Sequence, residues 1–132
     1  MIVVDASAVV ELLLRSAAGE AISKRVLRKG ETMHAPALLD VEVAHVLRRY
    51  VARKDMTAQR AKAALDLLVS FPMERYTHEQ LLQRIWELRD NVSAYDAAYV
   101  ALAEGLRAPL LTCDAKLAAA PGLRADMELV VA

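Results

Sequence analysis

Four acidic residues stand where the sequence pattern expects strands to end and helices to begin. Two of them follow short apolar runs, and two lie in the first turns of expected helices. In an open α/β sheet, ligands bind beyond the carboxyl ends of the strands, near the point where the strand order reverses. We therefore expect four carboxylates to converge at one edge of the sheet: Asp5, Glu42, Asp96 and Asp114.

Carboxylates in close proximity repel one another, so they must either take up protons or share a cation. A site made of carboxylate oxygens and water suits Mg²⁺ or Mn²⁺ rather than zinc. The histidines His34, His45 and His78 are scattered, and no Cys/His pair has the spacing of a zinc site. Such a metal can activate water and neutralise a leaving oxygen, which predicts phosphodiester hydrolysis.

Each acid alone has an ordinary structural explanation. An Asp after a strand often caps the next helix, and a Glu near a helix start complements the helix dipole. Taken singly, Asp5 and Asp114 are as well explained as caps, and Glu42 and Asp96 as favourable first-turn charges. The metal interpretation depends on all four meeting in one place.

Alternating strand and helix patterns must position these acids. The first expected helix begins at Ser7 and ends at Leu14, and the next three cover 17–29, 38–50 and 57–70. A fifth begins at a capping box of Thr77 and Gln80 and ends at Arg89, and a sixth runs from Ser93 to Gly105. Expected strands are 2–4, 32–34, 110–112 and 128–131, with 72–75 as a weaker fifth. This alternation predicts an α/β fold with a central parallel sheet of four or five strands between two helical layers.

Length and composition exclude several classes of protein. With 132 residues the chain is expected to form a single domain, residues 1–132. The hydrophobic fraction of 56% excludes intrinsic disorder, and a single cysteine excludes an internal disulfide framework. Because no apolar run is long enough to span a bilayer, we expect no membrane association and a cytoplasmic location.

The net charge of zero argues against a global positive field that would hold nucleic acid. Basic residues nevertheless gather in one part of the chain. They could grip a substrate's phosphate backbone without reading its sequence, although a solvated helix face explains any one of them as well. The residues expected to contact RNA are Arg48, Arg49, Arg53 and Lys54.

Four motifs together resemble those of the PIN-domain family. The motifs are 5-DASAV-9, Glu42-Val43 followed by Leu47-Arg48-Arg49, 95-YDAAYVALA-103 and 111-LTCD-114. They occur in the same order and span nearly the whole chain. The small size is similar to that of the VapC toxins of toxin–antitoxin pairs.

The resemblance implies a three-layer PIN-like fold and a metal-dependent endoribonuclease that blocks translation by cutting RNA, often tRNA or rRNA. It implies Mg²⁺ or Mn²⁺ as cofactor, a VapB-like antitoxin as partner, and a homodimer. Asp5, Glu42, Asp96 and Asp114 match the catalytic acids, of which Asp5, Asp96 and Asp114 are assigned to the metal. Ser7 and Thr112 match polar residues that support the carboxylates.

Two other functions stay open at this point. The chain could be a catalytically silent binding module that keeps the acids for packing or for a partner. It could also be a phosphotransfer enzyme with Asp5 as an aspartyl nucleophile, although Ser7 stands where such phosphatases carry a second Asp. Tyr95, Tyr99 and Leu102 recur at helical spacing, and we interpret them as core or dimer-face residues.

Overall fold

The computed structural model describes residues 1–131 and contains a five-stranded parallel sheet. The strand order is β3-β2-β1-β4-β5, and every neighbouring pair is parallel. The sheet confirms the expected α/β class and includes the weaker fifth strand. Its members are β1 (Ile2–Val4), β2 (Met33–Pro36), β3 (Met73–Tyr76), β4 (Leu110–Thr112) and β5 (Met127–Leu129).

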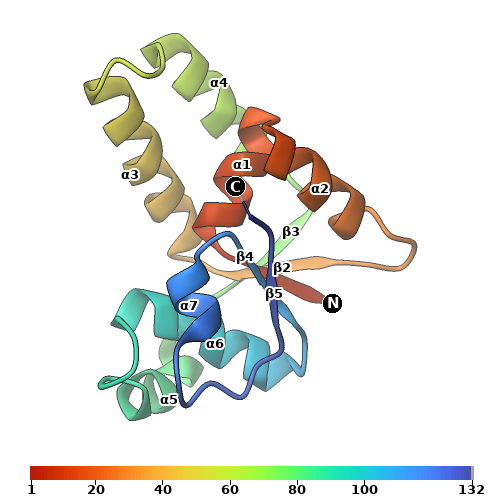
Figure 1. Cartoon of the computed structure of the whole chain (residues 1–132), viewed down its shortest axis with the longest axis vertical. Helices are drawn as coiled ribbons and strands as arrows, with labels where there is room; N and C mark the ends of the chain where they lie inside the picture. Colours follow the sequence, from red (N-terminus) through yellow and green to blue (C-terminus); the bar gives the residue numbers. More distant parts are fainter. Residues whose placement is uncertain (132) are drawn as a thin grey trace.

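Helices cover both faces of the sheet, which gives the expected three layers (Figure 1). On one side lie α1 (Ala6–Leu14), α2 (Ala17–Val26), α3 (Leu39–Ala52) and α4 (Ala58–Val69). On the other side α6 (Ala94–Leu106) packs on β1, β2 and β4, next to α5 (Leu82–Glu87). The short helix α7 (Ala115–Ala119) lies against β4 and β5.

The three central strands are apolar and buried on both faces, as this layering requires. All residues of β1, β2 and β4 are buried, including Ile2 and Leu110, which are fully inaccessible. At the sheet's edge, β3 and β5 are only partly covered. The central strands therefore form a rigid base, and the side chains that follow β1 and β4 are held by it.

The switch in strand order lies between β1 and β4. From β1 the chain proceeds outward to β2 and β3, then returns across the sheet to place β4 on the opposite side of β1. Helices that follow β1 and β4 therefore diverge at their starts, which leaves a crevice at the carboxyl edge. Asp5 follows β1 directly, and Asp114 follows β4 after one intervening residue.

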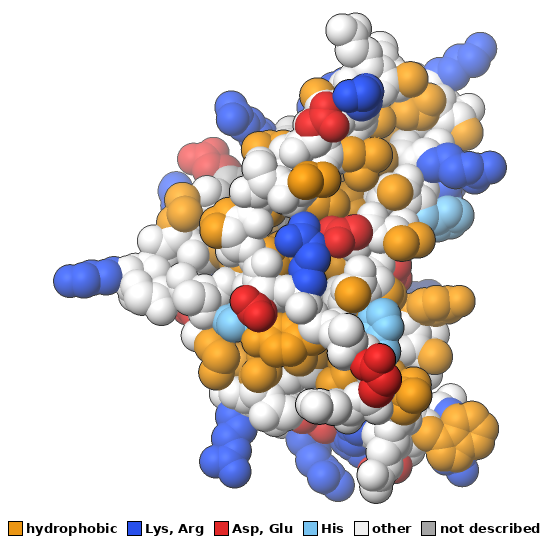
Figure 2. All heavy atoms as spheres, turned by 180° about the vertical axis from the view of Figure 1, so that it is seen from behind, with side chains coloured by type: hydrophobic (Ala, Val, Ile, Leu, Met, Phe, Trp, Pro, Cys, Tyr) orange, Lys and Arg blue, Asp and Glu red, His pale blue; other side chains and the backbone are white. Residues whose placement is uncertain are grey.

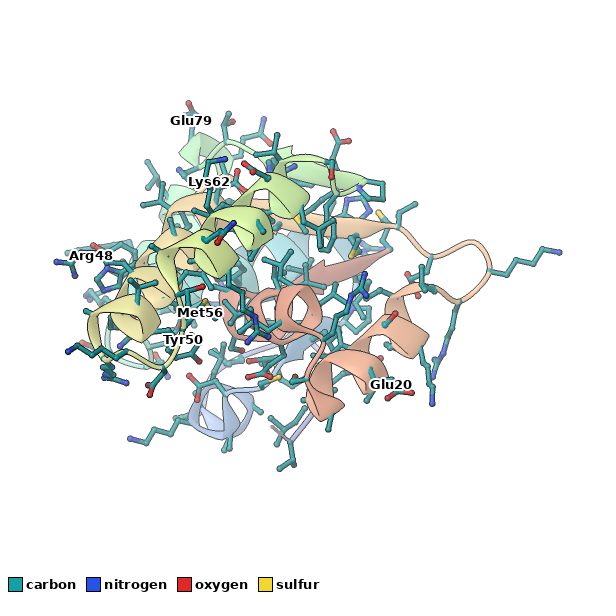
Figure 3. The ribbon with its side chains drawn as sticks, turned by 90° about the horizontal axis from the view of Figure 1, so that it is seen from above. Glu20, Arg48, Tyr50, Met56, Lys62 and Glu79 are labelled. Carbon is teal, nitrogen blue, oxygen red and sulfur yellow. The ribbon has the colours of Figure 1, made fainter. Side chains whose placement is uncertain are left out.

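Helices α3 and α4 form a hairpin that extends away from the sheet (Figure 1). Arg48, Tyr50, Met56 and Lys62 all come from this hairpin (Figure 3). The turn between the two helices contains Lys54, whose φ of 62° is left-handed. The start of α3 therefore lies at the sheet, whereas its end lies far from it.

Helices α1 and α2 meet at a corner that only glycine permits. A Cβ at Gly19 would stand 2.0 Å from the carbonyl oxygen of Glu11, well inside van der Waals contact. Ser16 caps α2 by accepting the N–H of Gly19 at 3.0 Å. This close approach fixes α1, whose first residues border the carboxyl edge of the sheet.

One expected helix end and one expected helix start differ from those observed. The pattern predicted a helix over 17–29, but α2 ends at Val26, because the chain then turns toward β2 through Gly30 at a φ of 80°. The first helix is capped by Asp5, which accepts the N–H of Ala8, and not by Ser7. Ser7 lies inside α1 and is free for another role.

The expected capping box of Thr77 and Gln80 is wrong. The segment forms a short 3₁₀ turn, η1 (Glu79–Leu81), before α5, and no side chain caps its start. The ring of His78 instead accepts the N–H of Leu38 at 3.2 Å. This contact ties the segment to the β2–α3 connection, and α5, which follows the turn directly, ends at Glu87 and not at Arg89. Within residues 1–131 no helix is long and apolar enough to cross a membrane.

Candidate metal-binding active site

Asp5 is the most deeply placed acid of the site, with only 5% of its surface exposed. Its Oδ1 accepts the hydroxyl of Ser7 at 2.6 Å and the backbone N–H of Ala8 at 3.0 Å. Its Oδ2 accepts the hydroxyl of Thr112. Burial of a charged carboxylate raises the pKa of Asp5, and these three hydrogen bonds oppose the rise.

Ser7 and Thr112 connect the two strand ends at the switch point. The Ser7 hydroxyl accepts the N–H of Cys113 at 2.9 Å, and the Thr112 hydroxyl accepts the N–H of Asp114 at 2.9 Å. Each hydroxyl thus accepts from the β4 side while it donates to Asp5. These hydrogen bonds fix the orientation of the Asp5 carboxylate relative to the backbone that follows β4.

Asp114 begins α7 and keeps one oxygen away from the helix. Its Oδ1 accepts the backbone N–H groups of Lys116 and Leu117, at 2.9 and 3.2 Å. The capping explanation for Asp114 is therefore correct, but it uses only one oxygen. The same dual use applies to Asp5, which caps α1 and also faces the other acids.

Glu42 is half-buried in the first turn of α3 and bonds to a residue of α6. The hydroxyl of Tyr99 donates to its Oε1 at 2.5 Å, and Tyr99 is 1% exposed. Burial raises the pKa of Glu42, the Tyr99 hydrogen bond lowers it, and the charges of Asp96 and Asp5 raise it. The pKa of Tyr99 is raised far above its ordinary value, so its proton stays on the phenol.

Asp96 completes the group from the first turn of α6, whose start Ser93 caps by accepting the Asp96 N–H at 3.1 Å. Burial raises the pKa of Asp96, and the neighbouring charge of Asp114 raises it further. Charges therefore act between Asp5 and Asp96, between Glu42 and both of them, and between Asp96 and Asp114. The structure brings the four expected acids to one edge of the sheet.

No lysine or arginine among residues 1–131 forms a salt bridge with any of these four carboxylates. Over the same residues, no three His, Cys, Asp or Glu side chains stand close enough together to form a ready metal site. The four acids therefore interact through their charges, and their side chains do not form a closed coordination shell. Their oxygen-only donors fit Mg²⁺ or Mn²⁺, because hard cations prefer carboxylate oxygen.

Comparisons with known proteins give the chain's family. A family model described as the PIN domain matches residues 2–123. Ribonuclease VapC1 of Mycobacterium tuberculosis is 50% identical over 129 residues, which cover 97% of this chain and 96% of the relative. The chain belongs to the VapC family of PIN-domain proteins.

Two further matches agree with this assignment. Ribonuclease VapC12 of the same organism is 45% identical over 130 residues, 98% of this chain and 99% of the relative. The crystal structure of VapBC2 from Rickettsia felis, bound to a promoter DNA fragment, has a TM-score of 0.70 at 17% identity and covers 98% of each chain. At that identity the likeness shows the fold alone, and it confirms the predicted PIN-like architecture.

The four expected RNA-contacting residues of this VapC-family chain do not all lie on one surface. Arg49 lines a cavity together with Glu42, whereas Arg48 lines a different one between α3 and α4 with Lys62. Arg53 and Lys54 lie at the far end of the hairpin. On the face shown in Figure 2, many Lys and Arg side chains project at the outline, others lie beside acidic side chains, and they do not gather in one patch.

Tyr99 is the one residue of the PIN-domain site whose role sequence reasoning missed. It was expected only in the core or at a dimer face, and it is indeed buried, as is Leu102. Its hydroxyl, however, bonds to Glu42 across a sequence separation of 57 residues. The available signal was its place three residues after Asp96, which puts both on neighbouring faces of α6.

Proposed function

We propose that the chain is an Mg²⁺- or Mn²⁺-dependent endoribonuclease toxin acting in the cytoplasm on tRNA or rRNA, and thereby inhibiting translation. The observation that carries the proposal is the group of four carboxylates at the switch point, with which no cationic side chain of residues 1–131 is paired. Acids that serve stability alone are normally paired when partly buried. The names of VapC1 and VapC12, both ribonucleases, support the reaction class.

Asp5, Asp96 and Asp114 are the residues that would hold the metal. Asp5 is fixed by Ser7, Ala8 and Thr112, so its orientation is set before any cation arrives. When bound, the metal would stabilise the charge that develops on the phosphate and the leaving oxygen. Three hydrogen bonds to a buried carboxylate suit a fixed ligand better than an attacking nucleophile, which disfavours the aspartyl-phosphate alternative.

Glu42 is positioned to act as the general base. Tyr99 holds its Oε1, so Oε2 is the atom that would take a proton from the attacking water. The raised pKa of Glu42 moves it toward the operating pH, which favours proton transfer. Tyr99 itself keeps its proton and serves to orient the carboxylate.

We propose two protein partners for the chain. The VapBC2 complex of Rickettsia felis supports a VapB-like antitoxin. Large apolar side chains on the surface support a homodimer, because exposed apolar groups commonly mark contact surfaces. Among those exposed by more than half are Leu27, Val69, Leu82 and Trp86.

The decisive experiment compares acid variants with a surface control. We expect Asp5→Asn and Asp96→Asn to abolish metal-dependent cleavage of a tRNA and rRNA panel, and the growth inhibition that induction causes. Asp66→Asn, an exposed acid on α4 paired with Lys62, should leave both intact. Circular dichroism checks that each variant folds. Near wild-type cleavage by either site variant would refute the site. A folded wild type without EDTA-sensitive cleavage would favour the silent binding module.

A further inference from the structure

A cavity of about 430 Å³ opens beside the acidic site, and the proposed reaction leaves it unused. Glu42 is shared between the cavity and the acid group. Two other lining residues, Ala6 and Tyr95, directly adjoin Asp5 and Asp96 in the chain. If a phosphate of the substrate lies at the acids, the part of the substrate next to that phosphate therefore lies at this cavity.

The walls of the cavity combine an aromatic side chain, an apolar floor and hydrogen-bonding groups. Tyr95 is 67% exposed, unlike Tyr99 on the same helix, which is fully buried. Val46 supplies apolar surface, and His45 and Arg49 supply nitrogen donors. A flat ring that stacks on one side and hydrogen-bonds at its edge matches these walls.

We propose that this cavity binds one nucleobase of the RNA, next to the scissile phosphate, with Tyr95 as its stacking surface and His45 and Arg49 at its polar rim. The inference rests on the proposed function and adds a specificity site to it. Because stacking tolerates every base, whereas edge contacts discriminate, His45 would contribute the base preference.

The line of charge along α3 favours RNA over a second protein chain as the occupant. Arg49 follows Glu42 by seven residues, which places both on the same face of α3, and Arg53, which ends the helix, follows one turn further on. The cations thus continue from the acid group for about 16 Å. A strand whose phosphate lies at the acids and whose next base enters the cavity would meet these cations along its backbone.

The first test measures stacking without cleavage. The probes are short single-stranded RNAs, each with 2-aminopurine at one position. The labelled positions surround a cleavage site mapped with the wild-type protein, or cover the whole RNA if no cleavage occurs. The RNAs are bound in EDTA to the Asp5→Asn variant. We expect fluorescence to fall by at least about twofold at one position. Adding Tyr95→Ala should remove that quenching, Tyr95→Phe should keep it, and Trp86→Ala, an equally exposed aromatic on α5, should not change it.

The second test measures cleavage. We expect Tyr95→Ala to lower kcat/KM about tenfold, the usual effect of losing one stacked base, and Tyr95→Phe to stay within about twofold. An abasic residue at the quenched position should lower wild-type cleavage by the same factor and should not lower that of Tyr95→Ala further. This non-additivity identifies the base and Tyr95 as partners.

The outcomes separate the two proposals. Cleavage by the wild type with no abasic position affected by Tyr95 would overturn the nucleobase site and leave the ribonuclease intact. Quenching that depends on Tyr95 without cleavage would overturn the ribonuclease and leave the nucleobase site intact. If sedimentation shows that Tyr95→Ala changes the oligomeric state and no position is quenched, the cavity is an interface between copies and the nucleobase site is wrong.

Discussion

The acids at the two edges of the sheet are paired in opposite ways. Near the amino-terminal edge, the guanidinium of Arg25 bonds to Glu128 at 2.7 and 2.9 Å and to Glu31 at 2.6 Å. The amino group of Met1 lies 2.8 Å from Glu31. At the carboxyl edge, Glu42 and Asp96 receive no such cation within residues 1–131.

The difference shows which acids stabilise the fold and which lower its stability when they are charged. The pKa of Glu31 is lowered, first by the hydrogen bond from the amino terminus and then by Arg25. The pKa values of Asp5, Glu42 and Asp96 are raised by burial, and neighbouring carboxylates add to the rise. Removing a charge at the amino-terminal edge should therefore destabilise the folded protein, whereas removing one at the carboxyl edge should stabilise it.

The largest effect is expected from Glu42→Gln. The amide keeps the size of the side chain but cannot take a proton, so kcat should fall by about 10²–10⁴. Glu20→Gln, an exposed acid on α2 paired with Lys24, is the matched control and should leave kcat unchanged. Single-turnover RNA cleavage measures the chemical step. A loss below tenfold would show that Glu42 is not the base.

The amino-terminal edge should respond in stability and not in activity. Arg25→Met removes the cation between Glu31 and Glu128 and leaves two partly buried acids facing each other. We expect the free energy of unfolding to fall by about 2–3 kcal/mol. Urea denaturation measures this loss. RNA cleavage at a temperature where the variant is folded should remain close to wild type, and a selective loss of activity would contradict the division between edges.

A smaller effect is expected from Tyr99→Phe, which deletes only the hydroxyl that bonds to Glu42. Losing the fixed orientation of the base should lower kcat about tenfold and leave KM within about twofold. Tyr50→Phe, on α3 and away from the acids, serves as the control. Equal decreases in kcat for both variants would mean that general loosening, and not the contact with Glu42, causes the loss.

The strand ends could be predicted because they depend on local pattern alone. Asp5 and Asp114 follow apolar runs, and parallel strands bring such ends to one edge whatever the loops do. The supporting hydroxyls of Ser7 and Thr112 were expected from the resemblance to the PIN-domain family and not from this pattern, and both do donate to Asp5. The start of α6 at Ser93 was also correct, since its cap is made within four residues.

Contacts between distant segments could not be predicted in this way. Thr77 and Gln80 have the types of a capping box, but no side chain caps the turn there, and the neighbouring His78 bonds to Leu38, 40 residues away. Tyr95 and Tyr99 share one helical pattern, yet one is exposed and the other buried. Their difference depends on which elements pack against α6, which residue types and spacing along one helix do not specify.

The smallest effects concern pH, and they should differ in sign between the edges. Because the pKa of Asp96 is raised on folding, the folded state binds more protons than the unfolded state just above pH 3.8. Stability from this group therefore falls as pH rises, and Asp96→Asn should make the metal-free protein more stable near pH 7. With allowance for solvent screening of a half-exposed group, the gain should be about 0.5–1 kcal/mol. Below about pH 3.8 the gain should vanish.

Glu31 should show the reverse. Its pKa is lowered on folding, so its contribution is fully present above the unfolded value of 4.5 and is lost as pH falls through the lower folded value. Glu31→Gln should destabilise the protein near pH 7 by about 1 kcal/mol and lose that effect in acid. Urea titrations of both variants and the wild type in EDTA, from neutral to acid pH, measure the two differences. If both had the same sign near pH 7, the acids of the carboxyl edge would not be held at a cost to stability, and the contrast between the two edges would be wrong.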